Sequence, residues 1–192
     1  KIVFDGNAQD YHIGLDDSDD SLTIGLGSAL GTTSYMNINA DGSITKPLQP
    51  AFLVKPASNQ SDFAQGSVVT IDFGTEVFDN NGDFASNTFT APVTGRYCFQ
   101  FAIQINQISN QDSALYYYIE LNTSNRQYYN LSAIQEAVGS SAGQLYFTLS
   151  ASALADMDAN DTVTCRVVHG GTSGTGPSDI STNSHWSGFL VC

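Results

Sequence analysis

The chain has 192 residues and a formal net charge of −13 at pH 7, yet only 13% of its residues are charged, against about 25% in an average globular domain. Its six Lys and Arg form no cluster, which excludes the basic stripe that nucleic acid or an anionic membrane requires. No run of 18 apolar residues occurs, so no membrane insertion is expected. Glu and Lys are scarce, whereas Val, Ile, Thr, Tyr and Phe recur in short bursts, and this composition predicts an all-β protein.

Residues 1–47 are rich in Asp and Gly and hold only short apolar stretches. Strands are expected at Lys1–Phe4, Tyr11–Leu15, Leu22–Leu26 and Tyr35–Asn39, the last followed by an Asp41-Gly42 hairpin signal. A piece of this size cannot bury a core alone. We therefore expect a β-rich shaft or neck that needs partner copies or the following domain. Because the chain begins without Met inside an expected strand, we also expect a C-terminal part of a longer protein.

Two acidic runs are candidates for a metal site. Asp16, Asp17, Asp19 and Asp20 could hold Ca²⁺ if three chains brought copies together, although crowded carboxylates are more typical of a solvated turn. The run Asp156–Asp161 begins like a calcium loop but lacks the Gly and Glu that an EF-hand needs at positions six and twelve. The metal content therefore stays unknown, with Ca²⁺ as the candidate ion.

Residues 48–192 follow a linker that contains Pro47 and Pro50, and they show regularly spaced strand signals separated by turns. A short stretch at 151–158 could form a helical turn. About nine to ten strands in this length predict a β-sandwich or jelly roll. The expected strands are Ala51–Val54, Val68–Phe73, Thr88–Ala91, Gly95–Ile105, Ala114–Asn122, Gln127–Ala133, Gly143–Leu149, Asp161–His169 and Ser187–Cys192.

The stretch Gly95–Phe101 carries aromatic residues at every second position. Tyr97, Phe99 and Phe101 share one face of a strand, and three such rings bury on the order of 450–750 Å². That face must belong to the core. The opposite face carries Cys98, Gln100, Ala102 and Gln104, which are uncharged and of small to medium size.

These aromatic residues belong to a longer spaced pattern, formed by Phe73, Asp79, Phe84, Phe89, Gly95, Tyr97, Phe99 and Phe101. The pattern resembles the globular head of the complement first-component q subunit, a branch of the tumour-necrosis-factor-like jelly rolls. The spacer between Phe84 and Phe89 is two residues shorter than the family pattern. The segments Asn160–Cys165 and His185–Val191 resemble two further strands of the family, so the resemblance covers about residues 50–192.

The resemblance implies a homotrimer that is closed around a threefold axis through one face of the sandwich. The candidate interface residues are Cys98, Gln100, Ala102, Gln104, Tyr116 and Tyr118. The segment from Phe4 to Thr33 resembles Gly/Asp-rich segments near the fibre tips of phages and other viruses. Together, the two resemblances suggest a fibre-like shaft that ends in a trimeric head.

No catalytic pattern is present, so we expect no enzyme. Signatures of metalloproteases, serine hydrolases and phosphate-binding loops are missing. His169, Asp179 and His185 border one long stretch and could approach each other to form a metal or acid–base cluster, although loop polar groups are the more common case. The three cysteines, Cys98, Cys165 and Cys192, lack metal-site spacing and are expected to be free thiols.

Ligand contacts are expected on two loops held by the rigid sandwich. Both loops combine aromatic rings with hydrogen-bonding groups, as sugar recognition requires. The candidate ligand-binding residues are Asn125, Arg126, Tyr128, Tyr129, His169, Asp179, His185 and Trp186.

The sequence thus predicts a non-enzymatic, trimeric receptor-binding tip of a viral tail or head fibre, with phage as the favoured source. Its partners would be two copies of itself and a host-surface receptor, with a glycan or a protein as candidates, and it would be a virion surface appendage. The alternatives are a secreted adhesion or signalling module of the same fold and a purely structural trimerisation cap.

Overall fold

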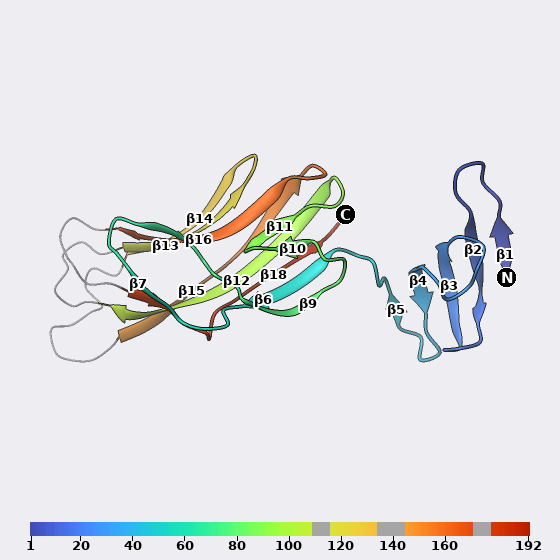
Figure 1. The fold of residues 1–192 in the computed structure, drawn as a ribbon, viewed down its shortest axis with the longest axis horizontal. Helices are drawn as coiled ribbons and strands as arrows, with labels where there is room; N and C mark the ends of the chain where they lie inside the picture. Colours follow the sequence, from blue (N-terminus) through green and yellow to red (C-terminus); the bar gives the residue numbers. More distant parts are fainter. Residues whose placement is uncertain (109–115, 134–144, 171–177) are drawn as a thin grey trace. The chain divides into compact units, whose positions relative to one another are not determined.

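A computed structural model describes residues 1–108, 116–133, 145–170 and 178–192 (Figure 1). The chain forms two compact units, Lys1–Gln49 and Pro50–Cys192, here called the N-terminal unit and the head. Within the described ranges every regular element is a β-strand, eighteen in all. The described residues contain no helix that is long and apolar enough to cross a membrane.

The N-terminal unit is a five-stranded antiparallel sheet in which each strand pairs with the next one along the chain (Figure 1). Four of its strands match the segments expected from apolar spacing, and β5 adds a fifth. The strands are β1 (Ile2–Phe4), β2 (Tyr11–Asp16), β3 (Ser21–Leu26), β4 (Ser34–Ile38) and β5 (Ile44–Thr45).

One face of this sheet is apolar on all five strands, and we call it the apolar face. The strand registers pair Ile2 with Ile13, Ile13 with Ile24, and Ile24 with Met36. None of the eleven side chains on this face is buried. They are Ile2, Phe4, Tyr11, Ile13, Leu15, Leu22, Ile24, Leu26, Met36, Ile38 and Ile44.

The opposite face of the sheet is polar and covered by the unit's own segment 27–33. Leu26 N donates to Thr33 O at 2.9 Å, and the His12 ring contacts Gly27 O through Nδ1 at 2.8 Å. Gly25 permits this close approach, because a Cβ there would collide with Thr33 O and lie 2.7 Å from the His12 ring. The buried side chains of this unit are therefore polar: His12, Ser21 and Thr23.

The head is a sandwich of two antiparallel sheets. The first, here the β12 sheet, runs β7-β17-β12-β18-β6-β9, and β15 pairs with the other edge of β12. Its long strand β12 pairs with β15 along nearly its whole length. The strands are β6 (Ala51–Lys55), β7 (Gln60–Phe63), β9 (Thr75–Asp79), β12 (Gly95–Ile108), β15 (Leu145–Met157), β17 (Ser178–Ile180) and β18 (His185–Leu190).

The second sheet of the head, here the β13 sheet, runs β10-β11-β16-β13-β14, and β8 also pairs with β16. Its central strands β13 and β16 pair over eight residues, from Tyr116 opposite Gly170 to Thr123 opposite Val163. The strands are β8 (Val68–Thr70), β10 (Phe84–Ala85), β11 (Thr88–Thr90), β13 (Tyr116–Thr123), β14 (Gln127–Ala133) and β16 (Thr162–Gly170).

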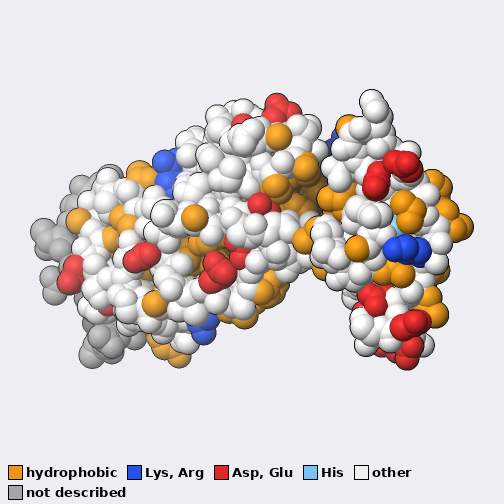
Figure 2. Space-filling model, turned by 45° about the vertical axis from the view of Figure 1, so that its right-hand side comes forward, with side chains coloured by type: hydrophobic (Ala, Val, Ile, Leu, Met, Phe, Trp, Pro, Cys, Tyr) orange, Lys and Arg blue, Asp and Glu red, His pale blue; other side chains and the backbone are white. Residues whose placement is uncertain are grey.

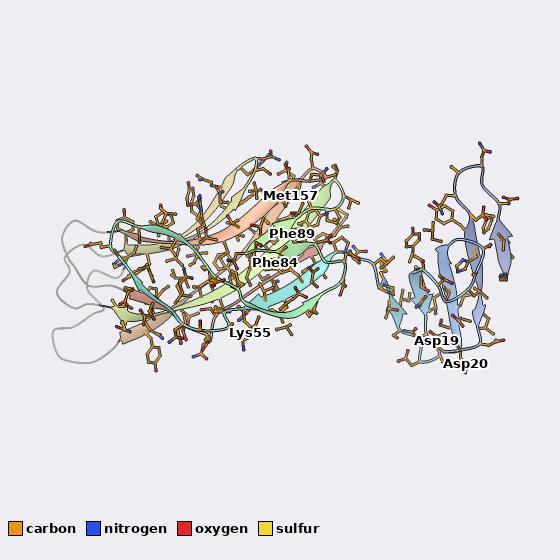
Figure 3. All side chains as sticks on the ribbon, in the orientation of Figure 1. Asp19, Asp20, Lys55, Phe84, Phe89 and Met157 are labelled. Atoms are coloured by element: carbon orange, nitrogen blue, oxygen red, sulfur yellow. The ribbon has the colours of Figure 1, made fainter. Side chains whose placement is uncertain are left out.

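The core lies between the two sheets and is dominated by aromatic rings. Phe52 contacts Phe89 and Trp186 at ring-centroid distances of 5.0 Å each, and Phe99 contacts Phe89 at 5.8 Å. Phe84 and Phe89 can be followed inside the head in Figure 3. Tyr97, Phe99 and Phe101 all point into this core, so the prediction from their alternate spacing is confirmed.

The all-β sandwich is as predicted, but two details differ. The head has thirteen strands in its described part, because the short strands β7, β9, β10 and β17 lack clear apolar alternation. Residues 151–158 do not form a helical turn and belong mostly to β15. The small side chains of Ala151, Ala153 and Ala155 lie opposite Phe101, Phe99 and Tyr97, so pairing with large aromatic residues outweighs the helix propensity of Ala.

Candidate functional site: a polar pocket at one end of the head

The pocket is created by an irregularity in β12. Pairing with β15 is regular up to Ile105 and resumes at Ile108 after a register shift. Gln107 has a positive φ of 57°, which is uncommon for a residue other than Gly. A bulge of this kind re-aims the extra side chain, and here Gln107 turns toward β17.

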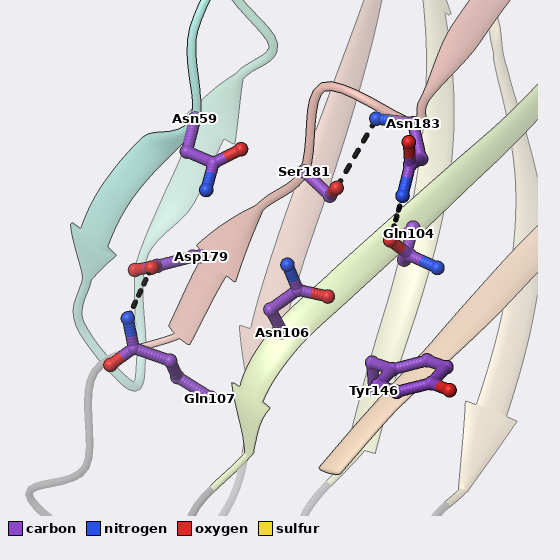
Figure 4. A pocket seen from close by; sticks show the side chains of 8 residues that line it. All are labelled: Asn59, Gln104, Asn106, Gln107, Tyr146, Asp179, Ser181 and Asn183. Atoms are coloured by element: carbon purple, nitrogen blue, oxygen red, sulfur yellow. Dashed lines mark hydrogen bonds between the residues drawn. The ribbon is translucent and has the colours of Figure 1, made fainter. Parts of the chain in front are cut away.

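Asp179 on β17 accepts a hydrogen bond from the Gln107 side chain. Gln107 Nε2 donates to Asp179 Oδ2, and the backbone N of Asp62 donates to Oδ1 at 2.9 Å (Figure 4). The Asp179 side chain is almost fully buried. A buried carboxylate is costly unless hydrogen bonds satisfy it, so these two donors hold Asp179 in a defined position.

The other wall of the pocket is a second hydrogen-bonded group. Asn183 Nδ2 donates to Gln104 Oε1 at 3.0 Å, and the backbone N of Asn183 donates to Ser181 Oγ at 3.2 Å (Figure 4). The backbone N of Thr182 donates to Asn59 Oδ1 at 3.1 Å. Side chains from three separate segments are thereby fixed around one cavity.

The cavity has a volume of about 430 Å³, within the range typical of small-molecule sites. Amides, hydroxyls and one carboxylate line it, together with the Tyr146 ring, which is 71% exposed. Among the lining residues that the structure describes there is no Lys, Arg, His or Cys. The lining residues are Asn59, Gln104, Asn106, Gln107, Tyr146, Asp179, Ser181 and Asn183. Such a set can hydrogen-bond and stack with a hydroxyl-rich ligand.

Of the eight predicted ligand-binding residues, the pocket contains only Asp179. The stretch 170–186 is not one open loop, because its described part forms β17 and the start of β18. Trp186 is fully buried in the aromatic core, and His169 is buried against Tyr117 at a ring-centroid distance of 4.4 Å. Neither side chain reaches a ligand from solvent, which corrects both predictions. His185 is exposed on the outer face of the β12 sheet.

The second predicted ligand group lies at the turn between β13 and β14. Arg126 pairs with Asp156 at 3.0 Å, and Asp156 lies opposite Arg96 near the start of β12. The pocket lies near the end of the same strand, so the two groups occupy opposite ends of the head. Tyr128 packs against the core and burial raises its pKa, whereas Tyr129 is 60% exposed. The two adjacent rings therefore do not form one surface.

The six predicted interface residues divide between the two sheets. Cys98, Gln100, Ala102 and Gln104 alternate with the core residues of β12 and face outward from the β12 sheet. Tyr116 and Tyr118 stack on the outside of the β13 sheet at 6.2 Å. The two candidate contact surfaces therefore lie on the outer faces of different sheets, and their part in a trimer stays a prediction.

The outer face of the β12 sheet carries no Asp, Glu, Lys or Arg across three rows of paired residues. Cys98 lies between Leu154 and Phe189, and Gln100 lies between Ser152 and Ser187. The third row places Ala102 between Ser150 and His185. Leu154 and Phe189 are 56% and 43% exposed. The core of a protein interface is depleted in charged residues, so this face is a candidate contact surface.

The candidate metal ligands do not gather. The described residues contain no group of three or more His, Cys, Asp or Glu arranged to hold a metal ion, so His169, Asp179 and His185 form no such cluster. Asp16 Oδ1 accepts hydrogen bonds from the hydroxyl and backbone N of Ser18, and these bonds lower its pKa. Asp19 and Asp20 lie at the turn between β2 and β3 (Figure 3). The acidic run is thus a hydrogen-bonded turn in the single chain.

Sequence reasoning missed most of the pocket. One signal could have revealed its origin: Ile103 and Ile105 follow strand spacing, but the next apolar residue is Ile108. A step of three in a strand of period two indicates a bulge. Asn59, Ser181 and Asn183 carry no such signal, because they reach the pocket only through the packing of distant segments.

The fold was compared with solved structures. Murine APRIL at pH 8.0 is 9% identical, with a TM-score of 0.50 over 74% of this chain and 99% of that one. The globular domain of zebrafish complement 1qA is 17% identical, with a TM-score of 0.47 over 75% of this chain and 98% of that one. No curated protein matches the chain.

Two packed antiparallel sheets with this strand order define a jelly-roll domain of the C1q and TNF-like class. The C1q domain family matches residues 51–191. The chain therefore belongs to the C1q family, and the predicted family resemblance of the head is confirmed. Domains of this class are often extracellular, trimeric recognition modules and are non-enzymatic.

Proposed function

We propose that the chain is the non-enzymatic, homotrimeric receptor-binding tip of a viral fibre of the kind that phages carry, and that the pocket binds a hydroxyl-rich receptor group, a glycan, on the host surface. The observation that carries the proposal is the position of the pocket. Pro50 and Cys192 lie beside the start of β12, since Leu190 N donates to Pro50 O and Arg96 N donates to Cys192 O. Gln104 lies nine residues along β12 from Gly95, which is about 30 Å at strand rise.

The pocket is thus at the end of the head that is farthest from where the chain enters it. A binding site at this end stays accessible when the preceding residues are built into a fibre. The Phe4–Thr33 segment supports the viral origin through its resemblance to fibre-tip segments. The proposed location is the surface of the virion.

Receptor binding is tested by glycan-array and host-cell binding of the whole chain. Tyr146→Ala and Asn106→Ala change pocket residues and should weaken binding at least tenfold, because each removes a stacking or hydrogen-bonding group. Tyr129→Ala is the matched control, as Tyr129 is similarly exposed but lies on the other sheet. If all three variants bind equally well, the pocket is not the receptor-binding site. If the chain binds no glycan and no cell surface, it does not recognise a receptor.

Trimerisation is tested by light scattering, where three chains of 20.5 kDa should give about 61 kDa. We place the contact on the outer face of the β12 sheet, so Ala102→Arg should loosen the contact between heads and make Cys98, which lies on the same face, more reactive. Thiol labelling gives a second measure: Cys192 is exposed and should react first, whereas Cys98 should be shielded in the trimer. Burial raises the pKa of the Cys165 thiol, so Cys165 should stay unreactive. A monomer whose Cys98 reacts readily would contradict the proposal.

A purely structural trimerisation cap is the second candidate, favoured by the outer face of the β12 sheet, whose three rows carry no Asp, Glu, Lys or Arg. It predicts a 61 kDa trimer that binds no glycan and no cell. A secreted adhesion module is distinguished by electron microscopy of the complete protein, which should show a fibre ending in the head if the viral proposal holds.

A further inference from the structure

The apolar face of the N-terminal unit points to an interaction surface separate from the pocket and from the head. A single sheet normally covers its apolar face with a second layer. Here the layer supplied by the unit itself, segment 27–33, covers the polar face, since a Cβ at Gly14 would lie 3.1 Å from Leu30 and one at Gly25 would collide with Thr33 O. Figure 2 shows hydrophobic side chains gathered on the surface of this unit.

The exposed area is large for a surface that meets water. Six side chains of the apolar face are between 42% and 63% exposed: Ile2, Phe4, Tyr11, Leu15, Leu22 and Ile44. At roughly 200 Å² for a large apolar side chain, they expose on the order of 600 Å², which reaches the largest patches found on typical monomers. A standard protein interface buries about 800 Å² per partner, so the face is of interface size.

The distribution of charge allows the partner of the apolar face to be a second copy of the same unit. The unit contains seven Asp and two Lys, a net charge of −5, so two copies repel each other wherever their carboxylates meet. The Asp residues lie in turns or at strand ends, and none lies on the apolar face. Copies of the unit can therefore pack apolar face to apolar face while their carboxylates remain at the periphery.

We infer that the apolar faces of three copies of this chain pack against one another around a common axis and form the buried core of the shaft. The number three follows from the trimer in the proposed function, because assembled heads hold the attached units at a high effective concentration. The contact itself follows from the apolar face and does not depend on the receptor pocket.

Two pairs of neighbouring residues provide matched variants. Phe4 and Ile44 lie on the apolar face, while Val3 and Thr45 lie beside them on the polar face, and all four are exposed in the single chain. If the chain stays single, the double variant Phe4→Asp/Ile44→Asp should therefore have the same mass and the same hydrogen-exchange rates as the double variant Val3→Asp/Thr45→Asp. Only the first pair would place six carboxylates inside a trimeric core.

The experiment uses the whole chain carrying Ala102→Arg, so that the head contributes less to association. We expect this protein to retain the mass of three chains in light scattering. Adding Phe4→Asp and Ile44→Asp should reduce the mass to that of one chain, whereas adding Val3→Asp and Thr45→Asp should leave it unchanged. Backbone hydrogen exchange in β2 and β3 should accelerate at least tenfold in the Phe4/Ile44 variant alone. The exchange measurement decides the matter if Ala102→Arg leaves the head assembled.

The inference is overturned if both pairs of variants have the same mass and the same exchange rates. It is also overturned if β2 and β3 are protected in a monomer at every protein concentration, since the apolar face would then be covered within one chain. Loss of glycan binding through Tyr146→Ala would leave these results unchanged, so failure of the receptor proposal and failure of this one are distinguishable.

Discussion

The head and the N-terminal unit are both antiparallel, but they place their apolar side chains differently. In the head, the apolar faces of two sheets meet, and Phe52, Phe99 and Trp186 are fully buried. In the N-terminal unit, the only covered face is polar, and Ile2 is 63% exposed. Strand pairing alone does not make a core: a sheet needs a second apolar layer, which the head contains and which the residues of the N-terminal unit do not supply to their own apolar face.

The largest effect is expected from truncating the aromatic core of the head. Phe99→Ala removes a ring that contacts Phe52, Phe89 and Trp186, and should lower the free energy of unfolding by about 3–5 kcal/mol. Phe78→Ala, at a position 45% exposed, should cost less than about 1 kcal/mol. Denaturant unfolding of both variants measures the difference, and similar losses would show that the head core is not where the structure places it.

A smaller loss is expected from overfilling the same core. A Cβ at Gly188 would lie 2.5 Å from Phe99 and 2.7 Å from Phe52, and these rings cannot move because they are packed on all sides. Gly188→Ala should therefore destabilise the head by about 1–3 kcal/mol. Gly170→Ala also meets a ring, that of Tyr116, but this ring is 39% exposed and can swing away. Thermal unfolding should rank Gly188→Ala as the more damaging change; the reverse order would contradict the packing.

In the N-terminal unit, the sensitive contact should be the covering segment on the polar face. Gly25→Ala should displace segment 27–33 through the clash with Thr33 O. The amides of Leu26 and Gly27, which donate to Thr33 O and Asp10 O, should then exchange about tenfold faster, equivalent to about 1.4 kcal/mol. Gly42→Ala is the control, since its positive φ of 85° strains only its own turn. Unchanged amide exchange in Gly25→Ala would show that the polar face is open.

The smallest effect is expected from the surface carboxylates of the head. Hydrogen bonds from the backbone N of Asp158 and the Ser124 hydroxyl lower the pKa of Asp161 from its ordinary value of 3.8. Because the folded pKa is the lower one, this stabilisation is present above about pH 4 and is lost as the pH falls through the folded pKa. Asp161→Asn should flatten that part of the pH–stability curve. An NMR titration that gives Asp161 a pKa of 3.8 or higher would contradict these hydrogen bonds.

Local spacing predicted much of the head because its longest central strand alternates cleanly. Tyr97, Phe99 and Phe101 identify both the strand and its buried face. Alternation did not predict the partner of each strand. Residues 151–158 read as helix formers until pairing with β12 placed Ala153 opposite Phe99.

The binding residues were far less predictable. Trp186 and His169 looked like loop residues because the stretch between them is rich in Ser, Thr and Gly, yet both side chains are buried. Gln107 and Asp179 are 72 residues apart in sequence, and neither is unusual by itself. They meet only because a bulge in β12 turns one toward the strand that carries the other.

The sequence by itself determined the all-β class, the aromatic core of the head and the family, since these depend on composition and on the period-two alternation of neighbouring residues. Only the tertiary structure decided which polar residues share a pocket, which outer faces belong together and which face of the N-terminal sheet is left open. These depend on strand register and on contacts between distant segments, and a one-residue shift in register moves every side chain to the opposite face.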